Sequence, residues 1–286
     1  IGGTGKTPVV EYLANLLNAK GEKTAILSRG YLRKTRGTVL VSDGKDIHCE
    51  WQECGDEAYM LGKKLINVPI VVDEKRYRGG LYIVKNFKPD IIILDDGFQH
   101  RSLFRDLDLV TINANEKVEN YKMLPRGNLR EPMHSIKKRA DAVLITKGIL
   151  ETKMKNQLDN ETLPLFNTKI NANIFTNLKS KKEISSGDKV LLFSGIADSD
   201  SFEKTARSLE LKVLEHKSYQ DHYSFKRGHI VEIEERAKKI KANYIVTTEK
   251  DWVRIAPLNP NYRYAIIKIK IKVVEEERFI TIVEKR

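Results

Sequence analysis

The sequence predicts an α/β protein built on a mostly parallel sheet with helices on both faces. Short, continuous apolar runs such as Ile91–Leu94 and Ala142–Thr146 alternate along the chain with stretches of helical periodicity. Uninterrupted apolar strands of this kind are typical of parallel sheets that are buried on both faces. The chain also opens with a glycine-rich loop, residues 2–7, which leads directly into apolar residues at helical spacing.

Taken in order, the apolar patterns predict two successive sets of strands and helices. The first set has strands at 24–27, 39–41, 68–72, 91–94, 107–112 and 142–146, with helices at 9–17, 58–65 and 77–86. The second set has strands at 190–193, 212–214 and 244–247, a helix from about residue 201, and a helix at 230–240. At the C-terminus, isoleucine and valine alternate with lysine over residues 267–273, a pattern that predicts a half-buried strand.

Length and composition set the broad class. At about 150 residues per domain, 286 residues suggest two domains, and the polar segment 176–187 is the expected linker. We therefore expect one domain at 1–182 and a smaller α/β domain with the C-terminal strands at 183–286. Two cysteines exclude a disulfide scaffold. No apolar run approaches the roughly 18 residues of a membrane span. The sequence begins with Ile1 rather than Met, so we expect a truncated or processed chain.

The net charge of +12 favours anionic partners, which include nucleic acid, acidic membranes and phosphorylated small molecules. The basic residues are spread along the chain, and neither zinc-finger spacing nor an aromatic RNA-binding motif is present. A phosphorylated ligand or a membrane surface is therefore at least as well supported as nucleic acid. A lysine-rich surface that only keeps the protein soluble is the alternative.

The glycine-rich loop carries the strongest motif. It matches the second half of G-x-x-x-x-G-K-[ST], the phosphate-binding P-loop. Glycines let several backbone N–H groups point at one phosphate, and the following helix adds its positive end. Lys6 would reach the β- and γ-phosphates and the Thr7 hydroxyl would hold Mg²⁺. The expected nucleotide-binding residues are Ile1, Gly2, Gly3, Thr4, Gly5, Lys6 and Thr7. A turn that only caps a helix is the alternative.

A P-loop enzyme needs a second acidic site for its metal, usually at the end of a neighbouring strand. Asp95 and Asp96 directly follow the apolar run Ile91–Leu94 and fit that position. Adjacent residues of a strand point to opposite faces, so only one of the two carboxylates need bind Mg²⁺ directly. With the P-loop, they predict a P-loop NTPase-like fold for the first domain.

Several other side chains suit phosphoryl transfer to an alcohol, which needs a proton acceptor and cations around the transferring group. Asp56 opens a predicted helix, where it also suits an N-cap. His222, next to Asp221, could relay a proton with a carboxylate. Arg29 follows a strand end, the usual ligand edge of an α/β sheet. Arg126, Arg130 and Glu131 lie in a Pro- and Gly-containing loop suited to a substrate.

The ordered set of motifs resembles the tetraacyldisaccharide 4′-kinases, the lipid A kinases of Gram-negative bacteria. The matching segments run in family order and span nearly the whole chain: Gly2-Gly3-Thr4-Gly5-Lys6-Thr7-Pro8, Leu27-Ser28-Arg29-Gly30-Tyr31, Gly55-Asp56-Glu57, Asp95-Asp96-Gly97-Phe98-Gln99-His100, Leu129-Arg130-Glu131-Pro132, Phe193-Ser194-Gly195-Ile196-Ala197, Asp221-His222-Tyr223-Ser224-Phe225 and Thr248-Glu249-Lys250-Asp251.

The resemblance implies transfer of the ATP γ-phosphate to the 4′-hydroxyl of a tetraacylated glucosamine disaccharide 1-phosphate. Asp56, assisted by His222, would be the base, and Lys6 and Arg130 would stabilise charge at the phosphates. Mg²⁺ would be held by Thr7, Asp95, Asp96 and Glu131. The expected substrate-binding residues are Arg29, Gln99, His100 and Arg126.

The resemblance also implies a larger nucleotide domain and a smaller domain, joined by a hinge that closes over ATP. A phosphorylated amphiphile lies in an anionic leaflet, where basic residues contribute about 1 kcal/mol each. We therefore expect a monomeric, peripheral enzyme on the cytoplasmic face of the inner membrane, with no nucleic-acid partner.

Two other interpretations stay open. One is a different P-loop small-molecule kinase or NTPase. A GTPase fits poorly, because Thr248-Glu249-Lys250-Asp251 lacks the Asn and final Asp of an Asn-Lys-x-Asp guanine motif. The other is a basic, nucleic-acid-stimulated ATPase, which predicts hydrolysis that depends steeply on salt.

Overall fold

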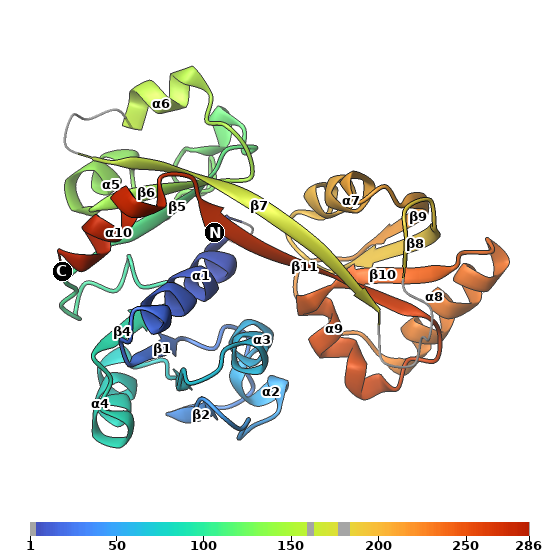
Figure 1. The fold of residues 1–286 in the computed structure, drawn as a ribbon, viewed down its shortest axis with the longest axis horizontal. Coiled ribbons are helices and arrows are strands. Elements are labelled where there is room, and N and C mark those ends of the chain that lie inside the picture. The colour runs from blue at the N-terminus through green and yellow to red at the C-terminus, as the bar shows by residue number, and fades with distance from the viewer. Residues whose placement is uncertain (1–3, 159–162, 177–183, 286) are drawn as a thin grey trace. The chain divides into compact units, whose positions relative to one another are not determined.

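The computed structural model describes residues 4–158, 163–176 and 184–285, which form two compact units (Figure 1). Unit 1 is built from the described parts of residues 1–29, 75–171 and 270–286, and unit 2 from those of 30–74 and 172–269. The expected boundary between residues 182 and 183 lies outside the described residues. Residues 30–74, expected in the first domain, cluster with unit 2, so each unit is discontinuous in sequence.

Unit 1 contains two groups of parallel strands. β1 (Thr24–Ser28) pairs with β4 (Ile91–Leu94), and β5 (Leu109–Asn113) pairs with β6 (Ala142–Thr146), which also pairs with the start of β7 (Leu165–Thr176). The helices of this unit are α1 (Lys6–Ala19), α4 (Arg76–Phe87), α5 (Met133–Arg139), α6 (Thr152–Leu158) and α10 (Glu276–Glu284), with the 3₁₀ turn η1 (Val118–Asn120). Ile112, Val143, Ile145 and Met154 belong to its buried core.

Unit 2 contains a parallel sheet in the order β11 (Tyr264–Val273), β10 (Tyr244–Thr248), β8 (Lys189–Ser194) and β9 (Lys212–Ser218). Apolar side chains of α7 (Ser199–Ser208) pack on one face, and those of α8 (Arg227–Lys239) and α9 (Glu249–Ile255) pack on the other. The 3₁₀ turn η2 (Ala256–Leu258) follows α9. The predicted second α/β set is therefore confirmed.

The N-terminal part of unit 2 is a small α/β segment. β2 (Val39–Ser42) pairs with β3 (Ile70–Val72) in the antiparallel direction, whereas the sequence predicts a parallel arrangement. The short helix α2 (Trp51–Cys54) leads through Gly55 into α3 (Asp56–Lys64), and α3 packs against α9. This packing brings the start of α3 and the start of α9, which are far apart in the sequence, to the same part of unit 2.

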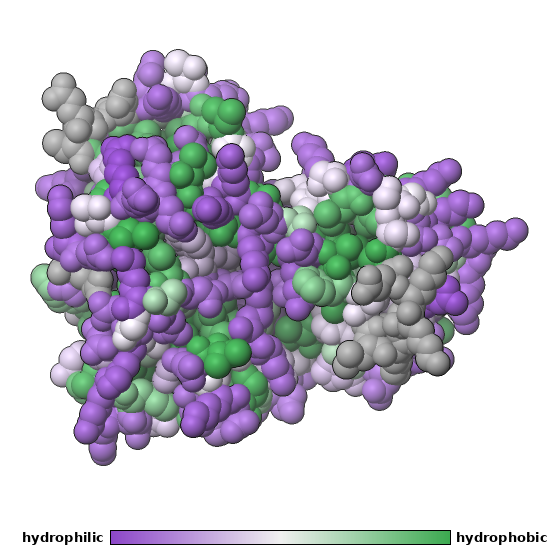
Figure 2. All heavy atoms as spheres, viewed as in Figure 1, coloured by the Kyte–Doolittle hydropathy of each residue, from purple (hydrophilic) through white to green (hydrophobic). Residues whose placement is uncertain are grey.

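The surface agrees with the charged composition. Figure 2 shows hydrophilic residues over most of the face in view, broken by small hydrophobic patches. The large apolar side chains that are exposed include Phe104 and Ile149, which are 87% and 89% accessible. Within the described residues, no helix has both the length and the apolar character that crossing a bilayer requires.

Candidate active site

The phosphate loop leads into α1 through Gly5. Gly5 has a φ of 81°, in the left-handed region that glycine adopts at little cost, and a Cβ there would lie 3.2 Å from Thr146 Cγ2. The Thr146 hydroxyl donates a hydrogen bond of 2.8 Å to the carbonyl of Thr4, which ties the loop to the end of β6. The predicted binding residues Ile1, Gly2 and Gly3 lie outside the described residues. Lys6 and Thr7 are the first two residues of α1.

Lys6 and Arg130 both contact the carboxylate of Asp96. Lys6 Nζ lies 3.1 Å from Asp96 Oδ1, and Arg130 Nη1 donates to Asp96 Oδ2 at 3.0 Å. Burial alone would raise the pKa of Asp96, but the two cations outweigh it and lower that pKa. The site therefore holds an ionised carboxylate between two cations at the N-terminal end of α1, where anions are also favoured.

Asp95 has a different environment from its neighbour. It follows β4, it is 7% exposed, and its Oδ2 accepts a hydrogen bond of 2.9 Å from the Ser28 hydroxyl at the end of β1. Asp96 has a φ of 52°, a conformation that is uncommon for a residue other than glycine. This turn after β4 directs the two adjacent carboxylates to different partners.

Glu131 is held by arginines. Its Oε2 accepts from Arg101 Nη2 at 3.1 Å and from Arg139, and these two guanidinium groups outweigh burial and lower its pKa. Its other oxygen, Oε1, is buried and has no hydrogen-bond partner among the described residues. Carboxylate and hydroxyl oxygens are the ligands that Mg²⁺ prefers. The oxygens of Thr7, Asp95, Asp96 and Glu131 are therefore of the kind that Mg²⁺ binds, but among the described residues the carboxylates of Asp95, Asp96 and Glu131 do not gather within 4.8 Å of one another.

A cavity of about 630 Å³ adjoins these groups within unit 1. Lys6, Asp95, Asp96, Arg130 and Glu131 line it, as does Gln99, one of the expected substrate-binding residues. Much of the remaining wall is apolar and comes from α1, α4, β4 and β5, including Leu13, Leu81, Val84, Ile93 and Val110. The cavity therefore joins a charged end to an apolar wall.

The other expected substrate-binding residues lie apart from the cavity lining. Arg29 and Arg126 are exposed, and neither lines the cavity. Desolvation lowers the pKa of His100, and the guanidinium groups of Arg76, Arg105 and Arg29 lower it further. His100 Nε2 lies 3.2 Å from the Ser102 hydroxyl.

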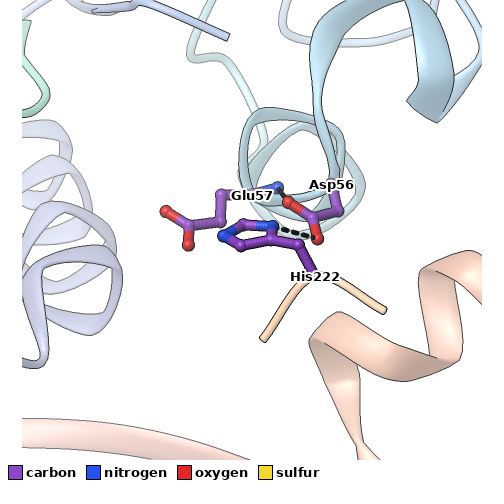
Figure 3. Close-up of side chains that lie close together, drawn as sticks. All are labelled: Asp56, Glu57 and His222. Atoms are coloured by element: carbon purple, nitrogen blue, oxygen red, sulfur yellow. Dashed lines mark hydrogen bonds and ion pairs between the residues drawn. The ribbon is translucent and has the colours of Figure 1, made fainter. Parts of the chain in front are cut away.

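In unit 2 the structure brings Asp56 and His222 together. His222 Nδ1 lies 3.0 Å from Asp56 Oδ2, and Figure 3 shows the imidazole between the side chains of Asp56 and Glu57. Gly55, with a φ of 92°, is the N-cap of α3, so Asp56 is the first helical residue rather than the expected N-cap. A Cβ on Gly55 would lie 2.9 Å from the carbonyl of Tyr31, so the turn that places Asp56 requires glycine.

Asp56 is a buried, ionised carboxylate. Its Oδ1 accepts from the backbone N–H of Glu57 at 2.9 Å, and Arg254 Nε lies 3.6 Å from its Oδ2. Burial would raise its pKa, but His222, Lys250 and Arg254 outweigh this effect and lower the pKa. His222 itself has a φ of 59°, a sparsely populated conformation that clusters at functional sites in proteins.

Lys250 is a member of this cluster for which the sequence suggests no role. Its Nζ lies 3.0 Å from Glu57 Oε1, 3.2 Å from Asp221 Oδ1 and 3.1 Å from His222 Nε2. Oxygen and nitrogen atoms of Asp56, Glu57 and His222 lie within 4.8 Å of one another, close enough to hold a metal ion. Since the ammonium group of Lys250 contacts two of these three side chains, the chain itself supplies a positive charge there.

The start of α9 holds this cluster in place. Thr248 caps the helix by accepting from the Asp251 N–H at 3.0 Å. Asp251 is fully buried, accepts from the backbone N–H of Gly195 and pairs with Arg254. The sequence places Gly195 and Thr248–Asp251 in separate motifs, and only the tertiary structure joins them.

Comparisons with known proteins find one family along the whole chain. A family model described as tetraacyldisaccharide-1-P 4′-kinase matches residues 1–286. The tetraacyldisaccharide 4′-kinase of Aquifex aeolicus is 39% identical over 231 residues, covering 79% of this chain and 70% of the relative. That of Desulfotalea psychrophila is 38% identical over 264 residues, covering 89% and 76%.

A crystal structure described as the "apo" form of LpxK from Aquifex aeolicus in complex with ATP is 32% identical. It aligns with a TM-score of 0.74 over 100% of this chain and 85% of that chain. The strands, helices and phosphate loop thus define an α/β protein of the P-loop NTPase-like class. Within that class, the chain belongs to the tetraacyldisaccharide-1-P 4′-kinase family.

Proposed function

We propose that this protein transfers the γ-phosphate of ATP to the 4′-hydroxyl of a tetraacylated glucosamine disaccharide 1-phosphate, a step of lipid A biosynthesis. Family membership and the complex of the related LpxK with ATP support this proposal. The observation that carries it in this chain is the convergence of Lys6 and Arg130 on one carboxylate at the start of α1. A transferring phosphoryl group needs such cations around it.

On the nucleotide side, the P-loop residues bind the phosphates, and Lys6 makes the most direct contact with them. Lys6 and Arg130 exchange contacts with Asp96 for contacts with phosphate oxygens and stabilise the charge that develops in the transition state. Thr7, Asp95, Asp96 and Glu131 would hold Mg²⁺, which when bound would supply positive charge next to the phosphates of ATP.

On the acceptor side, Asp56 is the general base and His222 assists it. The ionised carboxylate takes the proton of the acceptor hydroxyl as the new O–P bond forms, and the bond between the γ-phosphorus and the bridging oxygen of ADP breaks. A proton acceptor must be ionised at working pH, which the lowered pKa of Asp56 provides. Arg29, Gln99, His100 and Arg126 bind the phosphorylated substrate.

The proposal includes a setting for the reaction. The protein acts as a monomer, peripheral to the cytoplasmic face of the inner membrane, because its acceptor is an amphiphile of that leaflet and its net charge is +12. A nucleotide domain that contains the P-loop and a second domain, joined by a hinge that closes over ATP, also remain part of it.

The test is transfer of labelled γ-phosphate from Mg·ATP to the tetraacylated disaccharide 1-phosphate in detergent micelles. We expect a product that carries the label at the 4′ position, located by mass spectrometry, and one ADP formed for each product. ATP hydrolysis without labelled lipid would remove this acceptor and leave another P-loop kinase or NTPase as the function.

A further inference from the structure

The motif Thr248-Glu249-Lys250-Asp251 contains a lysine that the proposed function leaves without a role. Lys250 is on the first turn of α9, and its side chain is only 14% exposed. Its ammonium group contacts Glu57 on α3, Asp221 on the loop before His222, and Nε2 of His222. A lysine that touches the far nitrogen of a candidate proton-relay histidine can decide which nitrogen of that ring carries the proton.

We propose that Lys250 is a positioning residue that holds His222 in its neutral form with the proton on Nδ1, directed at Asp56. This inference deepens the proposed function, since the role it gives His222 rests on Asp56 being the base. Its structural part, the protonation state of His222, concerns the protein alone and needs no substrate.

The hydrogen-bond inventory supports this assignment. A lysine ammonium has three N–H donors and no acceptor. Lys250 Nζ has three partners at 3.0–3.2 Å, one for each N–H: Glu57 Oε1, Asp221 Oδ1 and His222 Nε2. His222 Nε2 must therefore accept, so it carries no proton. A neutral imidazole then has its proton on Nδ1, which lies 3.0 Å from Asp56 Oδ2 and donates to it.

The charges around the ring keep Lys250 in its ammonium form. Burial lowers the pKa of Lys250, but Glu57, Asp56 and Asp221 outweigh it and raise that pKa. The charged groups that face His222 are Asp56 and Glu57 from α3, Asp221 from its own loop, and Lys250 from α9, with Arg254 of α9 beyond Asp56. The Tyr31 ring packs edge-on at 5.3 Å. Without Lys250, three carboxylates would favour an imidazolium.

This arrangement decides where the proton of the reaction goes. Because Nε2 is occupied by Lys250 and Nδ1 already carries a proton, His222 has no free site for a second one. The proton of the acceptor hydroxyl therefore ends on Asp56, and His222 only orients that carboxylate and stabilises its charge. An imidazolium in its place would bind Asp56 more tightly and make it a weaker base.

The first test is nitrogen-15 NMR of the substrate-free protein labelled at its six histidines, with the His222 signals assigned by their loss in His222→Gln. The nitrogen chemical shifts separate protonated from unprotonated ring positions. At neutral pH we expect a protonated Nδ1 and an unprotonated Nε2. An imidazolium, or a proton on Nε2 alone, would overturn the inference.

The second test compares Lys250→Met with Lys250→Arg. In Lys250→Met we expect His222 to become an imidazolium at neutral pH, with kcat lower by about 10- to 100-fold, less than the ~10²- to 10⁴-fold that a whole general base contributes. KM for ATP should stay unchanged. Lys250→Arg keeps the charge and should restore the neutral ring. Unchanged His222 signals in a folded Lys250→Met would show that Lys250 is only structural.

Lys64→Met is the matched control. Lys64 is on the neighbouring helix α3, is 15% exposed, and pairs with Glu249 at 2.8 Å, so its loss removes a similar ion pair from the same pair of helices. We expect it to leave the His222 signals and kcat unchanged. An inactive wild-type protein whose His222 still carries its proton on Nδ1 would contradict the proposed function and leave the positioning role of Lys250 intact.

Discussion

Nδ1 of His222 lies 3.0 Å from Oδ2 of Asp56, although the two residues are 166 positions apart in the sequence. Both belong to unit 2. Gly55, the residue directly before Asp56, has a φ of 92°, and His222 itself has a φ of 59°, so both side chains depend on uncommon backbone conformations. Strained conformations persist only where the surrounding structure enforces them. The fold therefore holds this carboxylate and imidazole in one geometry before any substrate binds.

Replacing Asp56 with asparagine should abolish most of the phosphate transfer. The asparagine side chain keeps the shape of aspartate but cannot accept the proton, so we expect kcat to fall by about 10²- to 10⁴-fold while KM for ATP changes little. The measurement is steady-state transfer of labelled phosphate to the acceptor lipid at saturating ATP.

Glu234→Gln is the control for loss of a buried carboxylate. Glu234 is 6% exposed against 4% for Asp56, and it accepts a hydrogen bond of 3.2 Å from Tyr264. It has no contact with Asp56 or His222 in the described hydrogen bonds, so its loss should lower stability and leave kcat near wild type. Equal rates for Asp56→Asn and wild type would remove Asp56 as the base.

Asp56 should also make stability depend on pH in a defined direction. Its pKa in the folded protein is lowered, since His222, Lys250 and Arg254 outweigh the opposite effect of burial. A carboxylate of this kind stabilises the fold above its unfolded pKa of about 4, and that stabilisation is lost as pH falls below it toward the folded pKa.

We therefore expect the urea midpoint of the wild type to exceed that of Asp56→Asn at pH 7. The difference should shrink as pH falls below about 4. Urea denaturation of both proteins across this range measures it, and the other carboxylates cancel because they are the same in both. A difference that grows on acidification would show that the folded pKa of Asp56 is raised instead.

The sequence predicts the regular part of the fold well because apolar periodicity is a local property. The bounds expected for the strands Ile91–Leu94 and Ala142–Thr146 match β4 and β6. By contrast, the apolar patterns do not predict β7, because it is only half buried and includes the polar residues Asn167, Thr168 and Lys169. The assignment of residues 30–74 to unit 2 depends on contacts across long stretches of chain, which no local pattern reports.

The candidate site, like the fold, is only partly predictable from the sequence. Lys6, Asp95 and Asp96 follow from the P-loop motif and a strand end, and the structure brings Lys6 to within 3.1 Å of Asp96. The pairing of Asp56 with His222 follows from no spacing in the sequence, and the resemblance to a family is the only indication of it. The contact of Lys250 with His222 is visible only once α9 packs on α3.

Asp96→Asn should weaken the response to magnesium more than it weakens the fold. The carboxylate is 36% exposed, and exposed ion pairs contribute only about 0–1 kcal/mol, so its pairs with Lys6 and Arg130 add little stability. In the ligand role that we propose for it, however, Asp96 should matter at least as much as the supporting residues of metal sites, whose loss costs about 10- to 100-fold in affinity.

We expect half-maximal transfer by Asp96→Asn to need at least about 10-fold more Mg²⁺ at fixed ATP, with a thermal midpoint close to wild type. Titration of activity with Mg²⁺, after treatment with a chelator, measures this. Asp90→Asn is the control, since Asp90 accepts from the Lys23 N–H at 2.9 Å on the opposite end of β4. If both variants needed the same Mg²⁺ concentration as wild type, Asp96 would have no role at the metal.

Binding to membranes should depend on lipid charge. With a net charge of +12 and basic residues that each contribute about 1 kcal/mol near an anionic surface, the protein should sediment with vesicles that contain phosphatidylglycerol and much less with vesicles of phosphatidylcholine alone. Because the Debye length falls from about 10 Å at 0.1 M salt to about 3 Å at 1 M, the bound fraction should drop steeply as salt is added.

Two controls accompany the measurement. Sedimentation of the protein without vesicles shows how much of it aggregates. Sedimentation of a neutral soluble protein of similar size with vesicles shows how much protein is merely trapped in the pellet. Equal binding to both kinds of vesicle, unaffected by salt, would mean that apolar contacts rather than the positive charge hold the protein at the membrane.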